Sequence, residues 1–142
     1  MMKKQLKLKN QIGELARVNQ FIEEIADELG LDMELQMNLN LVMEEMVSNI
    51  IFYAYPEGTT ADIELTAESD GHELSFVLSD KGKAFDPTLK DDADPNVNPA
   101  EREIGGMGIF IVKNIMNEVT YQRLDGRNLL TMKKNIKALV SR

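Results

Sequence analysis

Glu45 and Asn49 are the two residues whose types and spacing first suggest metal chemistry. They stand four positions apart in the segment from Leu35 to Tyr55. At about 3.6 residues per turn, four positions bring two side chains to nearly the same side of a helix. Carboxylate, amide and water oxygens are the ligands that hard cations such as Mg²⁺ take in proteins. The pair could therefore hold one magnesium ion, although the same spacing also describes the solvated edge of an ordinary amphipathic helix.

A second candidate site lies in the run DKGKAFDP, residues 80–87. A carboxylate at a strand end, followed two residues later by a glycine, can approach the edge of a flat ring. Adenine presents an exocyclic amino donor where guanine presents an oxygen acceptor. Asp80 could therefore select adenine over guanine. The competing interpretation is an Asp-x-Gly turn with no ligand, which is common.

The third candidate is a glycine cluster, Gly105, Gly106 and Gly108, which directly precedes the apolar run IFIVKNIM. Glycines let backbone amides face a ligand, and the N-terminus of a helix favours anions, so phosphates could bind there. Glycines at this place could instead serve close packing between helix and sheet. The segment does not match G-x-x-x-x-G-K-[ST], which excludes a Walker-type phosphate loop.

Helices are predicted to position the first and third candidates. Apolar residues recur every three or four positions across 35–55, at Leu35, Leu39, Val42, Met46, Ile50 and Tyr53. This pattern predicts a helix, capped by Asp32 and ended by the turn at 56–58. A second stripe predicts a helix over 11–30 that stops at Gly30, and a third helix is expected over 107–116.

Strands complete the predicted fold. Apolar and polar residues alternate over 3–9, 61–67, 74–78, 118–123 and 128–135. The dipeptides Asp70-Gly71 and Asp125-Gly126 are hairpin turn signals, and the lysines of the first strand suit a sheet edge. Hairpins beside helices predict an α+β fold, a two-layer sandwich in which one mixed, mostly antiparallel sheet is covered on one face by helices.

Residues 86–104 show no periodicity and hold three of the four prolines in the chain. Connections longer than about 12–15 residues are usually functional lids or disordered segments. There is no internal repeat and no shift in composition, and 142 residues suit one domain with its own core. We therefore expect a single domain over 1–142, with a flexible lid at about 86–104.

Composition excludes several classes of function. The chain has no cysteine and one histidine, His72, which argues against a thiolate metal site, a histidine metal cluster and a Ser-His-Asp triad. The net charge of −8 argues against binding nucleic acid or an anionic membrane. No apolar run approaches the ~20 residues of a membrane span, and the N-terminal residues lack the apolar core of a signal peptide. A cytoplasmic protein is expected.

The order and spacing of the three motifs resemble those of the GHKL (Bergerat-fold) ATP-binding superfamily. The pattern E-x-x-x-N at 45–49 is similar to its N box, D-x-G-x-x-F-D-P at 80–87 to its G1 box, and G-G-x-G at 105–108 to its G2 box. The stretch from Gly105 to Lys134 is similar to the small anti-sigma-factor serine kinases of the RsbW and SpoIIAB type. The resemblance covers about Leu35 to Lys134. One departure is Tyr53, which stands where the family often has histidine.

The resemblance implies roles for individual residues. Glu45 would be the general base and Asn49 the magnesium ligand. Asp80 would bind the adenine amino group, with Gly82 allowing close approach. The remaining positions are phosphate contacts or pocket walls: Gly105, Gly106 and Gly108 at the phosphates, Thr131 at the adenine pocket, and Arg102 or, less favoured, Lys113 reaching a phosphate. The implied cofactors are ATP and Mg²⁺.

Two functions follow from this resemblance. The first is a serine/threonine protein kinase that phosphorylates an anti-anti-sigma partner of the STAS type and sequesters a sigma factor. The second is an ATP-gated protein-binding module without phosphotransfer, for which Glu45 would have no use. A homodimer through the first strand is also implied. A sensor histidine kinase is disfavoured, because His72 lies in an Asp-Gly turn.

Overall fold

The computed structural model describes residues 1–89 and 106–136 of the chain. The helical elements are a 3₁₀ turn at Ile12–Glu14, α1 (Leu15–Leu29), α2 (Met33–Asn49), a π-helical turn at Ile50–Ala54, a 3₁₀ turn at Pro87–Leu89, and α3 (Gly106–Ile115). The strands are β1 (Met2–Lys9), β2 (Asp62–Ser69), β3 (Glu73–Asp80), β4 (Glu118–Leu124) and β5 (Arg127–Asn135).

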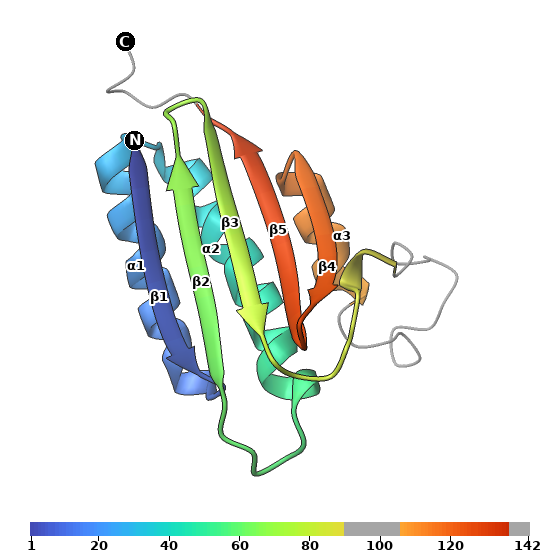
Figure 1. The fold of residues 1–142 in the computed structure, drawn as a ribbon. Coiled ribbons are helices and arrows are strands. Elements are labelled where there is room, and N and C mark those ends of the chain that lie inside the picture. Colours follow the sequence, from blue (N-terminus) through green and yellow to red (C-terminus); the bar gives the residue numbers. More distant parts are fainter. Residues whose placement is uncertain (90–105, 137–142) are drawn as a thin grey trace.

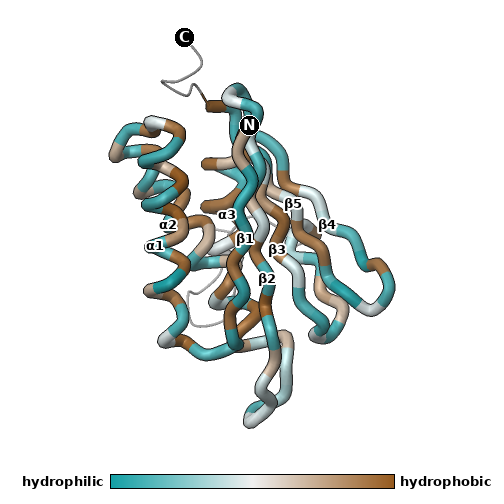
Figure 2. The backbone as a smooth tube through the Cα atoms, turned by 60° about the vertical axis from the view of Figure 1, so that its left-hand side comes forward, coloured by the Kyte–Doolittle hydropathy of each residue, from teal (hydrophilic) through white to brown (hydrophobic). Residues whose placement is uncertain are grey.

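The five strands form one sheet in the order β1-β2-β3-β5-β4, and every neighbouring pair is antiparallel. All three helices lie against the same face of this sheet (Figure 1). Seen from the side, the molecule has a helical layer and a sheet layer, with hydrophobic segments turned toward each other (Figure 2). The predicted two-layer sandwich is confirmed, and the sheet is antiparallel throughout.

The helix ends follow the local rules that the sequence suggested. Gly30 ends α1 in the left-handed region at φ 68°, where a side chain would be strained. The Asp32 carboxylate then accepts a hydrogen bond from the Leu35 amide at 2.8 Å and so caps α2. At the β4–β5 hairpin, Asp125 and Gly126 both have positive φ, as a tight two-residue turn requires.

The core lies between the two layers. Its fully buried members come from α1, α2, α3 and the inward positions of the strands, and the largest are Phe76, Leu8, Ile22, Ile25, Leu39, Met43, Met46, Ile63, Leu65, Leu74, Leu78 and Ile109. In the described part of the chain, no helix is long and apolar enough to cross a membrane.

The helix predicted over 35–55 changes form after Asn49. Its last turn, Ile50–Ala54, is π-helical, and the amide of Ile50 reaches the carbonyls of both Met46 and Val47. Because a π turn holds more residues than an α turn, it rotates the side chains that follow. Tyr53, predicted on the buried stripe, is therefore 37% exposed. Single π turns are frequent at functional sites.

Candidate functional site

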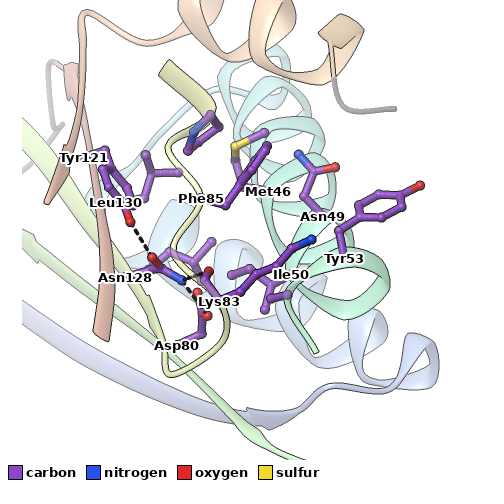
Figure 3. A pocket seen from close by; sticks show the side chains of 13 residues that line it. Met46, Asn49, Ile50, Tyr53, Asp80, Lys83, Phe85, Tyr121, Asn128 and Leu130 are labelled. Atoms are coloured by element: carbon purple, nitrogen blue, oxygen red, sulfur yellow. Dashed lines mark hydrogen bonds between the residues drawn. The ribbon is translucent and has the colours of Figure 1, made fainter. Parts of the chain in front are cut away.

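One pocket lies between α2, the end of β3 and the β4–β5 hairpin (Figure 3). It encloses about 480 Å³ of space, including its open mouth. Asn49 and Asp80, which belong to separate motifs in the sequence, line this same pocket. The full lining is Met46, Asn49, Ile50, Tyr53, Ala54, Leu78, Asp80, Lys83, Phe85, Pro87, Tyr121, Asn128 and Leu130. The walls are thus mostly apolar, with a few polar groups, which is typical of a site for a flat organic ring.

Asp80 is the last residue of β3 and is only 3% exposed. Its Oδ1 atom accepts hydrogen bonds from the Gly82 amide at 2.8 Å and from Asn128 Nδ2 at 3.0 Å. Both bonds fall on the same oxygen, so they set the orientation of the carboxylate and leave Oδ2 to accept a bond from a ligand. A buried acceptor of fixed direction favours an amino donor over a carbonyl oxygen.

Gly82 allows the turn after Asp80 to approach the end of α2. A Cβ atom at Gly82 would lie 2.6 Å from both the Cβ and the backbone oxygen of Ala54. The next residue, Lys83, donates its amide to that same Ala54 oxygen at 3.0 Å. On the other side of Gly82, the Lys81 amide donates to the Tyr55 hydroxyl at 2.8 Å. Only a glycine fits this contact without displacing backbone.

Glu45 lies beside the first turn of α3. A Cβ atom added to Gly108 would stand 2.8 Å from Glu45 Oε2. The structure therefore brings the carboxylate of the first motif against Gly108 of the third. The N-terminal turn of α3 presents backbone amides and the positive end of the helix dipole, a suitable place for phosphate oxygens. Glu45 stands one helical turn before Asn49 on the same element, and it is not among the residues that line the pocket.

Thr131 does not line this pocket, which corrects the prediction for that residue. Along β5 the side chains alternate between the two faces of the sheet. Leu130 lines the pocket and Met132 is fully buried in the core, so Thr131 between them faces away from the helices. The inward residue nearest the hairpin is Asn128, which sequence reasoning missed. Counting back by twos from the apolar Met132 and Leu130 would have found it.

Asn128 holds the turn after β3 against the β4–β5 hairpin. Its Nδ2 donates to Asp80 Oδ1 and, at 2.9 Å, to the Lys83 carbonyl. Its Oδ1 accepts from the Tyr121 hydroxyl and, at 3.1 Å, from Arg123. The amide is 6% exposed and uses two donors and two acceptor positions, and Figure 3 shows it between Tyr121 and Asp80. Such a satisfied buried network fixes one geometry.

Charge at the pocket is sparse. Lys83 is exposed to solvent as a whole, yet its side chain lines the pocket and extends toward Ile50 and Tyr53 (Figure 3).

The turn after β3 is held by further polar groups. Arg123 donates to the Gly82 carbonyl at 2.7 Å. Burial raises the pKa of Tyr55 above its usual 10.0, so its hydroxyl stays protonated at neutral pH.

Four candidate residues from the sequence remain. Gly105, Arg102 and most of the predicted lid lie outside the described residues. Gly106 is the first residue of α3. Lys113 donates from Nζ to the Thr88 carbonyl at 3.3 Å, which links α3 to the 3₁₀ turn where the predicted lid begins.

Comparison with known proteins agrees with this geometry. Residues 8–134 match the histidine kinase-like ATPase domain. The chain belongs to this family. The predicted resemblance to GHKL domains is confirmed, and the family supports ATP as the ligand of the pocket.

Relatives narrow the subgroup. The chain is 32% identical over 121 residues to the serine/threonine-protein kinase BtrW of Bordetella bronchiseptica, a match that covers 79% of each chain. It is also 32% identical over 102 residues to the serine-protein kinase RsbW of Staphylococcus aureus, and this match spans 64% of that relative's length. The predicted similarity to RsbW-type kinases is therefore confirmed.

Two solved structures share the fold at low sequence identity. One contains the RsbU and RsbW domains of a Mycobacterium tuberculosis protein, with a TM-score of 0.67, 15% identity, and coverage of 95% of this chain and 32% of that chain. The other is the catalytic domain of the histidine kinase ThkA, with a TM-score of 0.53, 14% identity, and coverage of 97% of this chain and 99% of that chain. These likenesses support the fold.

Proposed function

We propose that this chain is an ATP-dependent protein serine/threonine kinase of the anti-sigma-factor type. The observation that carries the proposal is that Asn49 and Asp80 line one apolar pocket while Glu45 stands beside the first turn of α3. Under this proposal Asp80 recognises the adenine base, Asn49 binds the metal ion, and Glu45 is the general base beside the helix end that would bind phosphate. The names of the relatives support protein serine phosphorylation as the reaction.

Each residue has a defined task in this proposal. Asp80 accepts the adenine amino group through Oδ2, and Gly82 permits the close approach of the turn. Backbone amides of Gly106 and Gly108 bind phosphate oxygens, with Gly105 and Arg102 proposed to extend that contact. The serine hydroxyl oxygen of the partner attacks the γ-phosphorus, and Glu45 takes the proton of that hydroxyl. The bond from γ-phosphorus to the bridging oxygen breaks, and ADP leaves.

The residues present fit a magnesium ion held jointly with ATP. No cluster of three or more His, Cys, Asp or Glu side chains suited to a metal ion occurs within residues 1–89 and 106–136. Mg²⁺ bound with nucleotides commonly uses few protein ligands and takes the rest from phosphates and water. The Asn49 carboxamide would supply the protein oxygen, and the ion would offset charge on the phosphates during transfer.

The cellular setting is proposed from the same resemblance. The phosphate acceptor is an anti-anti-sigma protein of the STAS type, and the chain also sequesters a sigma factor, so that its output is transcription regulation in the cytoplasm. We further propose that residues 1–142 form a single domain with a lid over about 86–104. A homodimer through β1 belongs to the same proposal.

The direct test has a binding arm and a transfer arm. We expect tight ATP binding, much weaker GTP binding, and a requirement for Mg²⁺, measured by calorimetry. With radiolabelled ATP and candidate STAS proteins, we expect label on the partner. Glu45→Gln is expected to retain ATP affinity and lose transfer, while the exposed loop variant Glu57→Gln keeps both. Tight ATP binding without transfer to any partner would support an ATP-gated binding module instead.

A further inference from the structure

The outward face of α2 is unexpectedly apolar. Its inward face buries Leu39, Val42, Met43, Met46 and Val47. On the opposite side, three large apolar residues four positions apart are exposed to solvent: Met33 at 66%, Met37 at 62% and Leu41 at 38%. At about 100° per residue, these three fall within a sector of about 80°. We call this set the outer stripe.

The outer stripe is unusual for a helix that packs on a sheet, because it exposes apolar side chains to solvent. Such a helix normally turns polar residues to solvent, opposite its core-facing side. Adjacent exposed apolar side chains that follow one helical face often mark a contact with another protein. Methionine is common at binding surfaces that accept apolar anchors, because its side chain is flexible and polarizable. The outer stripe is therefore a candidate docking surface.

The surroundings of the outer stripe are acidic. Residues 18–54, which include most of α1 and all of α2, contain eight acidic residues and no lysine or arginine. The acidic residues are Glu23, Glu24, Asp27, Glu28, Asp32, Glu34, Glu44 and Glu45. The first six are exposed, and Glu44 and Glu45 are half-buried. Basic side chains of the sheet layer, such as Lys3, Lys7 and Lys9, pair instead with acids of β2.

This charge pattern favours one kind of partner for the outer stripe over another. A second copy docked through the same stripe would bring two acidic helical layers face to face, which like-charge repulsion opposes. A partner helix with basic flanks would gain both burial of the apolar anchors and charge complementarity. Helices that lie on such surfaces carry anchors at i, i+3 or i+4, and i+7.

We propose that the outer stripe of α2 is the docking site for a basic amphipathic helix of a partner protein. Glu44 lies in the same helical sector as Met33, and Glu45 follows it. A helix docked on the stripe therefore lies along the element that carries Glu45 and Asn49. The proposal goes beyond phosphotransfer and holds whether or not the chain is a kinase.

The test uses a defined probe. A synthetic helix of about 18 residues, with leucines at the anchor positions and lysines elsewhere, carries a fluorescent label. Fluorescence anisotropy measures its affinity for the full chain. One control peptide has the same composition in scrambled order, which removes the stripe but keeps the charge. We expect the patterned peptide to bind at least about tenfold more tightly than the scrambled one.

Variants locate the site. The double variant Met37→Gln, Leu41→Gln is expected to lose at least about tenfold in affinity for the patterned peptide. The matched control Leu124→Gln, which changes an apolar residue 48% exposed on β4, is expected to bind as the wild type does. Thermal unfolding and ATP affinity of all variants should be unchanged, which separates failure of docking from failure of the ATP site.

Several outcomes would overturn the proposal. Equal binding of the patterned and scrambled peptides would show that charge alone is recognised. Wild-type affinity in the double variant would place the peptide elsewhere. If sedimentation shows a dimer that the double variant converts to monomer, the outer stripe is a contact between copies and not a surface for a basic helix.

Discussion

Alanine substitution at Gly82 and at Gly108 should affect stability differently, because the atoms that the new Cβ would meet differ. At Gly82 the Cβ would stand 2.6 Å from Ala54 Cβ and 2.6 Å from the Ala54 backbone oxygen. Neither atom can move without shifting the π turn or the turn after β3. Overpacking of this kind usually costs about 1–3 kcal/mol of unfolding free energy. Asp80 Oδ1, 2.9 Å away, would shift as well, so ATP affinity should also fall.

At Gly108 the nearest neighbour is the far end of a flexible side chain. The Cβ would lie 2.8 Å from Glu45 Oε2 but 3.6 Å from Glu45 Cβ, which is an ordinary contact. The carboxylate can rotate away, and alanine within a helix is favoured over glycine by about 1 kcal/mol. We therefore expect Gly108→Ala to keep its unfolding free energy within about 1 kcal/mol of the wild type.

The displaced carboxylate should nevertheless be costly for the reaction. General-base assistance is typically worth about 10²–10⁴ in rate, so Gly108→Ala should transfer phosphate at least about 100-fold more slowly. Urea unfolding and single-turnover label transfer measure the two quantities. Gly13→Ala is the control, because no atom lies within 4 Å of its added Cβ. Wild-type transfer by Gly108→Ala, or equal stability of Gly82→Ala and Gly13→Ala, would refute the reasoning.

Three further substitutions probe the site and the fold. Asn128→Leu should lower the unfolding free energy by about 1–3 kcal/mol, because it leaves the buried partners of the amide without a hydrogen bond. The same variant should show a smaller difference between ATP and GTP affinity in calorimetry. Thr131→Val should change ATP affinity by less than about twofold, since position 131 faces away from the pocket. The Glu73 and His72 amides lower the pKa of Asp70 below its usual 3.8. The Asp70 carboxylate therefore stabilises the fold at pH values above 3.8, and this stabilisation is lost as the pH falls through the lowered pKa of the folded state. Asp70→Asn should therefore make acid unfolding, measured by circular dichroism, less steep.

Features governed by neighbours in the sequence were predictable. The cap at Asp32, the stop at Gly30 and the Asp125-Gly126 hairpin depend on a few adjacent residues, and each is present in the structure. The burial of Leu39 and Met46 follows from helical spacing alone. Local rules thus sufficed for the elements that carry the site.

Features that depend on register or on distant contacts were not predictable in the same way. Side chains along β5 alternate between the two faces of the sheet, and the family resemblance that pointed to Thr131 does not fix which face position 131 occupies, whereas Asn128 faces the pocket. The π turn was hidden because the apolar spacing of Ile50 and Tyr53 also fits an α-helix. The contact between Arg123 and the Gly82 carbonyl requires the strand order β3-β5-β4, which no local pattern indicates.

The π turn explains how two of the separate motifs come to lie side by side. It ends at Ala54, whose carbonyl accepts the Lys83 amide, and the next residue, Tyr55, accepts the Lys81 amide. Two hydrogen bonds therefore tie the turn that follows Asp80 to the residues that directly follow the helix carrying Asn49 and Glu45. Since the outer stripe lies on that same helix, opposite its core-facing side, a docked partner and a bound nucleotide would contact one element. Coupling between them would be reciprocal by thermodynamic necessity, and its magnitude would depend on how far α2 and this turn move together.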